Sequence, residues 1–121
     1  MTKTQFARRV KHHQSLLGLN MWNVSSSIVK EFEVEGDEVV HGLLEFNRPS
    51  MSATVYLLGG LTDEESDGVA RHEMLHLRLA SYRHLCSSLI ENLDENGKTV
   101  MYRLLQDIDE QTVIAIERSL T

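Results

Sequence analysis

The sequence predicts an α+β fold: a small mixed or antiparallel sheet of three or four strands, with helices at the N-terminus, in the middle and at the C-terminus. Three observations lead to this prediction. The chain has 121 residues, enough for one modest hydrophobic core and little more. Strand-like segments are confined to its first half, and helical periodicity dominates its second half. We therefore expect a single domain over residues 1–121.

The N-terminal segment, residues 2–17, has the spacing of an amphipathic helix. Its apolar positions recur at helical intervals, and Gly18 is typical of the position just after a helix end. The same segment carries a basic cluster, which we interpret as the solvent-exposed face of the helix. The cluster consists of Lys3, Arg8, Arg9, Lys11, His12 and His13.

Three strands are predicted before the central helix. The first, over residues 21–33, is weak because serine dominates it, and Gly36-Asp37 is interpreted as the turn that follows. The second covers residues 39–46. The third, residues 53–58, is the clearest, because β-branched and aromatic residues run up to the Gly59-Gly60 pair.

Helical patterns fill the second half of the chain. Thr62 or Asp63 is a suitable N-cap, and helical spacing continues from there towards Leu93. An unbroken helix of that length would span roughly 45 Å. Because that is long for so small a domain, we expect a break between Arg78 and Ser88. The last helix is expected over residues 99–120.

Composition argues against several functional classes. The net charge is −6 and the isoelectric point is about 5.4, so nucleic acid is not an expected partner, because phosphate binding needs clustered Lys and Arg. No apolar run approaches the roughly 20 residues of a membrane span, and no membrane association is expected. Cys86 is the only cysteine, and its apolar neighbours indicate a small buried side chain. A reducing cytoplasm is the expected location.

Residues His72-Glu73-Met74-Leu75-His76 form an HExxH motif inside the predicted central helix. Residues four apart lie on one helical face, so both imidazoles can reach one metal ion about 2 Å away. Glu73 is next to them, where a carboxylate can take a proton from a metal-activated water. The motif therefore predicts a Zn²⁺ site with His72 and His76 as ligands and Glu73 as general base. The ordinary alternative is an amphipathic helix with two exposed histidines beside a solvated glutamate.

This segment resembles the active-site helix of the zincin superfamily of zinc metallopeptidases. The order of strands and helices resembles that of its smallest members, of the phage or bacterial type, over about residues 22–120. In those proteins a glycine-containing strand and an edge strand precede the motif, and a final helix supplies a glutamate. The resemblance implies that residues 42–46, residues 53–58 and the helix with Glu110 fill these places. It also implies a zinc-dependent peptide hydrolase with a peptide or protein substrate.

A catalytic zinc site normally has three protein ligands and a water, so one ligand lies outside the motif. The metzincin extension would need Gly at position 79 and His at position 82; Leu79 and Tyr82 exclude that class. Glu110 is the preferred third ligand. It has apolar residues three and four positions further on, and it opens an apolar helical stretch, as the ligand of glutamate-type zincins does. The alternatives are Glu117, Asp109 and His84.

In the implied mechanism, Glu73 accepts a proton as water attacks a peptide carbonyl and then passes it to the leaving amine. Residues 52–58, interpreted as an edge strand beside the metal, could pair with an extended substrate through main-chain hydrogen bonds. Two other functions compete. One is a non-catalytic zinc-binding protein or inactive zincin that serves as a structural or interaction module; the other is a regulator without metal. The sequence leaves the substrate and the oligomeric state undetermined.

Overall fold

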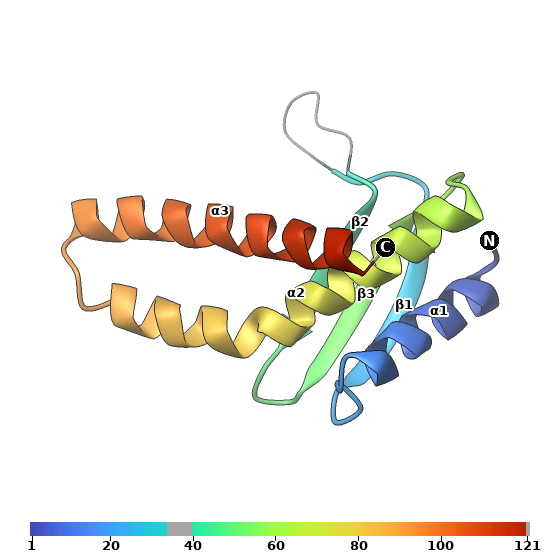
Figure 1. The fold of residues 1–121 in the computed structure, drawn as a ribbon, viewed down its shortest axis with the longest axis horizontal. Coiled ribbons are helices and arrows are strands. Elements are labelled where there is room, and N and C mark those ends of the chain that lie inside the picture. The colour runs from blue at the N-terminus through green and yellow to red at the C-terminus, as the bar shows by residue number, and fades with distance from the viewer. Residues whose placement is uncertain (34–39, 121) are drawn as a thin grey trace. The chain divides into compact units, whose positions relative to one another are not determined.

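The computed structural model describes residues 1–33 and 40–120. These residues form three helices and three strands in the order α1, β1, β2, β3, α2, α3, so the predicted α+β fold is confirmed (Figure 1). The chain divides into two compact units, Met1–Leu77 and Arg78–Thr121, with the boundary inside α2. The turn predicted at Gly36-Asp37 lies outside the described residues.

Helix α1 spans Lys3–Leu16, close to the predicted bounds. A capping box begins it: the Thr2 hydroxyl accepts from the backbone N–H of Gln5, and the Gln5 side chain accepts from the N–H of Thr2. Gly18, with φ at +70°, follows the helix end in the left-handed conformation that glycine adopts without strain.

The sheet contains β1 (Asn23–Val29), β2 (Gly42–Asn47) and β3 (Ser52–Leu58). Its order is β1-β3-β2, with β1 parallel and β2 antiparallel to β3. The prediction that residues 52–58 form an edge strand is therefore wrong: β3 is central, and among the described strands β1 and β2 are the edges. A strand's own pattern shows which face is buried, whereas its neighbours are decided by the connections between strands.

One face of the sheet carries the core of the first unit. Along β3 every second side chain is buried, as the strand repeat requires. Helix α1 and the first half of α2 cover this face (Figure 1). The opposite face is polar, since Ser, Thr and Asn occupy most of its positions. The core consists of Phe6, Val10, Leu19, Trp22, Ala53, Val55, Leu57, Ala70, Met74 and Leu77.

Helix α2 spans Asp63–Ile90 without interruption, so the predicted break is wrong. It begins with a second capping box, in which the Thr62 hydroxyl accepts from the N–H of Glu65 at 3.1 Å and the Glu65 carboxylate accepts from the N–H of Thr62 at 3.1 Å. The break was expected because one small core cannot accommodate so long a helix. The helix continues because its residues after Leu77 pack in the second unit instead.

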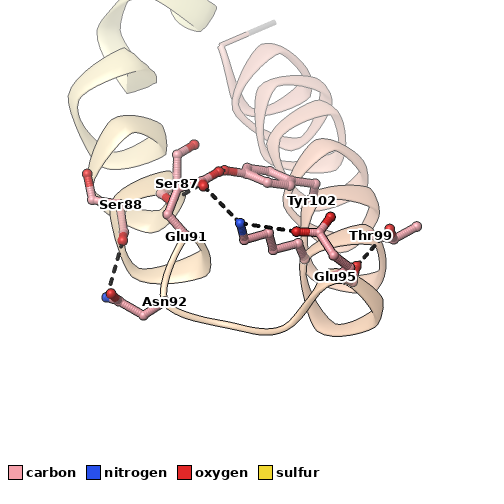
Figure 2. A network of polar contacts seen from close by, with 8 residues as sticks. Ser87, Ser88, Glu91, Asn92, Glu95, Thr99 and Tyr102 are labelled. Atoms are coloured by element: carbon pink, nitrogen blue, oxygen red, sulfur yellow. Dashed lines mark hydrogen bonds and ion pairs between the residues drawn. The ribbon is translucent and has the colours of Figure 1, made fainter.

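The second unit is an antiparallel hairpin made of the end of α2 and α3 (Glu95–Ser119). Cys86 is exposed on this hairpin, so the prediction that it is buried is wrong. Helix α3 begins four residues earlier than predicted, because the Asp94 side chain caps it by accepting from the N–H of Gly97 at 2.7 Å. Near the turn, the Tyr102 hydroxyl donates to the Glu91 carboxylate (Figure 2). Within residues 1–33 and 40–120, none of the helices combines the length and the apolar character needed to cross a membrane.

Candidate metal centre

His72 and His76 present their Nε2 atoms to each other from successive turns of α2. The two nitrogens lie 3.2 Å apart, and the ring planes are inclined at 70° with centroids 4.8 Å apart. Two nitrogens each about 2.05 Å from a tetrahedral zinc ion would be separated by about 3.3 Å. The pair therefore already has the spacing of two ligands of one zinc ion. An N–H···N hydrogen bond between neutral rings has similar spacing, so the distance fits a metal without requiring one.

Glu73 is buried, with 8% of its surface exposed, whereas both histidines are partly buried. On an α-helix it projects about 80° away from the mean direction of His72 and His76, towards the side that faces the sheet. The buried positions Ala70, Met74 and Leu77 define that side. Glu73 thus lies at the edge of the core, on the same turns of α2 as the two histidines. An amphipathic helix with two exposed histidines would have a solvent-exposed glutamate at this position, whereas Glu73 is buried.

Gly42, the first residue of β2, explains how α2 comes so close to this strand. A Cβ atom added there would lie 2.4 Å from Val69 Cγ1 and 3.6 Å from Glu73 Oε1. Only a residue without a side chain leaves room for the helix. The Glu73 carboxylate therefore lies beside the main chain of β2.

Among the described strands β2 is an edge of the sheet, and its first residue, Gly42, lies close to Glu73. The N–H of Leu58 donates to the carbonyl of His41 at 2.8 Å, so His41 and the residues at alternate positions after it bond to β3. In an antiparallel pair the intervening residues direct their N–H and C=O groups the other way. The N–H and C=O groups of Gly42, Leu44 and Phe46 accordingly point away from β3, on the outer side of this edge strand.

The candidates for the third ligand belong to the second unit. Glu110 is exposed on α3, and its assignment as ligand stays a prediction. Asp109 is buried and forms an ion pair with Arg83 at 3.3 Å, so its carboxylate already has a cationic partner. Glu117 is partly buried on α3. His84 would need a sharp bend to return to the motif, and α2 has no break between Arg78 and Ser88.

A second polar cluster in the first unit was not foreseen. The Asp67 carboxylate on α2 accepts from Arg9 Nε at 2.6 Å, and its Oδ1 lies 2.9 Å from His13 Nε2. His13 is 5% exposed, so its assignment to the solvent-exposed face is wrong, whereas the neighbouring Lys11 and His12 are exposed as predicted. The signal was present, because His13 continues the apolar helical spacing of Phe6 and Val10.

Burial lowers the pKa of His13, although Asp67 acts in the opposite direction. Burial also acts to raise the pKa of Asp67, but the hydrogen bonds from Arg9 and His13 outweigh it and leave that pKa below its ordinary value. His13 Nδ1 is buried without a hydrogen-bond partner among the described residues. A neutral ring that donates from Nε2 leaves this atom as a bare acceptor, whereas protonation would bury an unsatisfied N–H. We therefore assign His13 as neutral and Arg9 as the charge that balances Asp67.

The chain matches no family model, no curated protein and no solved structure.

Proposed function

We propose that the protein is a zinc-dependent peptide hydrolase, with His72 and His76 as metal ligands and Glu73 as general base. The observation that carries this proposal is the 3.2 Å spacing of the two Nε2 atoms beside a buried carboxylate. A purely structural zinc site has no need of a carboxylate at that position. A reducing compartment such as the cytoplasm is the proposed location, since a chain with one cysteine forms no intrachain disulfide.

We propose Glu110 as the third ligand, which gives the two-histidine, one-glutamate donor set common in catalytic zinc sites. Two of the alternatives are weaker, because Asp109 is paired with Arg83 and α2 has no bend that would return His84 to the motif. Glu117 is the remaining competitor. Comparing zinc affinity in Glu110→Ala and Glu117→Ala tests the choice: the loss should be at least about tenfold for Glu110 and small for Glu117.

When bound, zinc would supply a water with a pKa lowered towards about 7 and an electrophilic centre for the carbonyl oxygen. Glu73 would accept the proton of the attacking water and then donate it to the nitrogen of the leaving amine. Glu73 is 8% exposed, so we propose that packing restricts the motion of its carboxylate.

The outer edge of β2 is the proposed substrate-binding strand, in place of residues 52–58. An extended peptide could add to this edge by pairing with the outward N–H and C=O groups of Gly42 and Leu44. Such pairing would bring a peptide bond near Glu73, whose carboxylate lies beside Gly42. Main-chain pairing makes few contacts with substrate side chains, so we expect the protein to hydrolyse peptides of many different sequences.

The deciding experiment measures zinc per chain on untagged protein purified without chelators. We expect about one zinc ion per chain, its loss in His72→Ala, and its retention in Glu73→Gln. Glu73→Gln should lose at least about 100-fold in peptide hydrolysis. Absence of zinc after attempted reconstitution would refute the site. A fully active Glu73→Gln protein would refute the role of Glu73, and an inactive zinc-loaded native protein would favour a non-catalytic zinc protein.

A further inference from the structure

An open hollow lies on the polar face of the sheet, at the end where β1 and β3 begin and β2 ends. Its volume of about 330 Å³ is at the lower end of the range of about 300–1,000 Å³ for ligand sites, which suits a single long side chain. All three strands contribute to it, so the hollow belongs entirely to the first unit. Its polar lining consists of Asn23, Ser25, Glu45, Asn47, Ser52 and Thr54.

The register of the strands shows how this lining is arranged. Ser25 of β1 and Glu45 of β2 are both paired with Thr54 of β3, and paired residues on one face of a sheet have Cβ atoms about 5 Å apart. A second row of Asn and Ser side chains lies two residues away along each strand. The Glu45 carboxylate therefore shares the hollow with hydroxyl groups, which accept as well as donate hydrogen bonds.

Glu45 is the one charged residue among those that line the hollow. Within residues 1–33 and 40–120 its side chain accepts a hydrogen bond from the Tyr56 hydroxyl at 3.3 Å and forms no ion pair. The negative charge of Glu45 raises the pKa of Tyr56, so the phenol stays protonated and remains a neutral donor. The carboxylate thus keeps its full charge, and the net charge of −6 on the chain acts in the same direction. A cationic occupant is favoured and an anionic one is repelled.

The position of Glu45 on β2 connects the hollow with the proposed substrate-binding edge, so this inference rests on the proposed function. A peptide paired with the outer edge of β2 has one residue opposite Gly42, near Glu73. The residue opposite Glu45 is three positions further on, about 10 Å along the strand. Residues opposite each other share a face of the sheet, so the side chain of that peptide residue lies on the polar face, beside the hollow.

Arginine is the side chain that fits this position. It is long enough to extend from the edge over the polar face, and its five N–H donors can bond to the Glu45 carboxylate and to neighbouring hydroxyl oxygens together. We propose that the hollow receives an arginine side chain of the peptide substrate, three residues from the residue that faces Gly42. The other role open to Glu45, a charge that keeps an edge strand from pairing with other chains, predicts no preference for arginine.

Peptide binding to the full chain in a Glu73→Gln background tests the hollow without hydrolysis. The probes are a short acetylated and amidated alanine peptide with one arginine, and the same peptide with citrulline, which has nearly the same shape without the charge. By fluorescence anisotropy at low salt, the arginine peptide should bind at least about threefold more tightly. A further Glu45→Gln change should abolish this difference. Glu64→Gln is the matched control, because it removes the same charge from an exposed residue of the first unit outside the hollow.

Three results of this binding experiment would overturn the proposal: no binding of the arginine peptide, equal binding of both peptides, or a preference that survives Glu45→Gln. Circular dichroism should show that the variants are folded.

Hydrolysis by the zinc-loaded native protein gives a second measurement, with one arginine moved through the peptide position by position. The value of kcat/KM should be greatest when arginine lies about three residues from the cleaved bond, and Glu45→Lys should reverse the preference in favour of glutamate at that position. Cleavage that is indifferent to arginine, or that favours it elsewhere, contradicts the proposal. Binding that depends on Glu45 without any hydrolysis would refute the hydrolase and leave the hollow as a site for arginine-containing peptides.

Discussion

The substitution Gly42→Ala tests how closely α2 packs against β2. A Cβ at this position would lie 2.4 Å from Val69 Cγ1, more than 1 Å inside the roughly 3.5 Å of ordinary carbon contact. Val69 cannot readily turn aside, because a β-branched side chain in a helix has one strongly preferred rotamer. Retreat of the new methyl group is opposed by the backbone oxygen of Tyr56, 3.3 Å away. The helix or the strand must therefore move.

Overpacking of this kind costs about 1–3 kcal/mol, and the lower chain entropy of alanine in the unfolded state returns about 0.5–1 kcal/mol. We expect Gly42→Ala to lower the free energy of unfolding by about 1–2 kcal/mol, or the Tm by about 4–8 °C for a chain of this size. Urea denaturation monitored by circular dichroism measures this change in the free energy of unfolding.

Two controls use the same kind of change. Gly68→Ala lies in α2 with no atom within 4 Å of its new Cβ, and it should stabilise the protein by about 0.5–1 kcal/mol. Val69→Ala removes the clashing methyl group, so Gly42→Ala in that background should be nearly neutral, with a coupling energy of at least about 1 kcal/mol. Native-like stability of Gly42→Ala, or an equal loss in both backgrounds, would refute the packing argument.

Three further predictions concern charge, capping and metal. Burial lowers the pKa of His13 below its ordinary value of 6.5, so the unfolded chain binds this proton more readily than the folded protein. The contribution of neutral His13 to stability is therefore fully present above pH 6.5 and is lost as the pH falls through the pKa of the folded state. Between pH 7.5 and 5 the urea midpoint should therefore fall less in His13→Gln than in the native protein. The lowered pKa of Asp67 causes a second loss of stability, below the ordinary value of 3.8 for this carboxyl group. Asp94→Ala should destabilise the protein by about 1 kcal/mol in thermal unfolding through loss of the cap on α3, whereas Asp94→Asn should cost much less. If zinc binds as proposed, a chelator should lower the Tm of the native protein and leave that of His76→Ala unchanged, since only a bound metal contributes to stability.

Several features of the structure could be predicted from local sequence alone. The bounds of α1 follow from Thr2 and Gly18, because a cap and a left-handed glycine act within one helical turn. The start of α2 follows from Thr62 for the same reason. The approach of His72 and His76 needs nothing beyond a continuous helix, since a separation of four residues places both on one face.

Other features depend on contacts between distant segments. The central position of β3 depends on which strands pair with it, and local pattern carries no information on this. The continuity of α2 depends on its pairing with α3, for example through Arg83 and Asp109. The burial of His13 depends on Asp67, fifty-four residues further along the chain.

The sequence by itself determined the α+β class, the positions of the main elements and the HExxH pair, because these follow from interactions within a few residues. Only the tertiary structure decided that β2 is one of the two edge strands of the described sheet, that Gly42 lets α2 and Glu73 come close to it, and that His13 is buried beside Asp67. These features arise from side chains that meet only after folding, where close packing and loss of water set both the geometry and the charge.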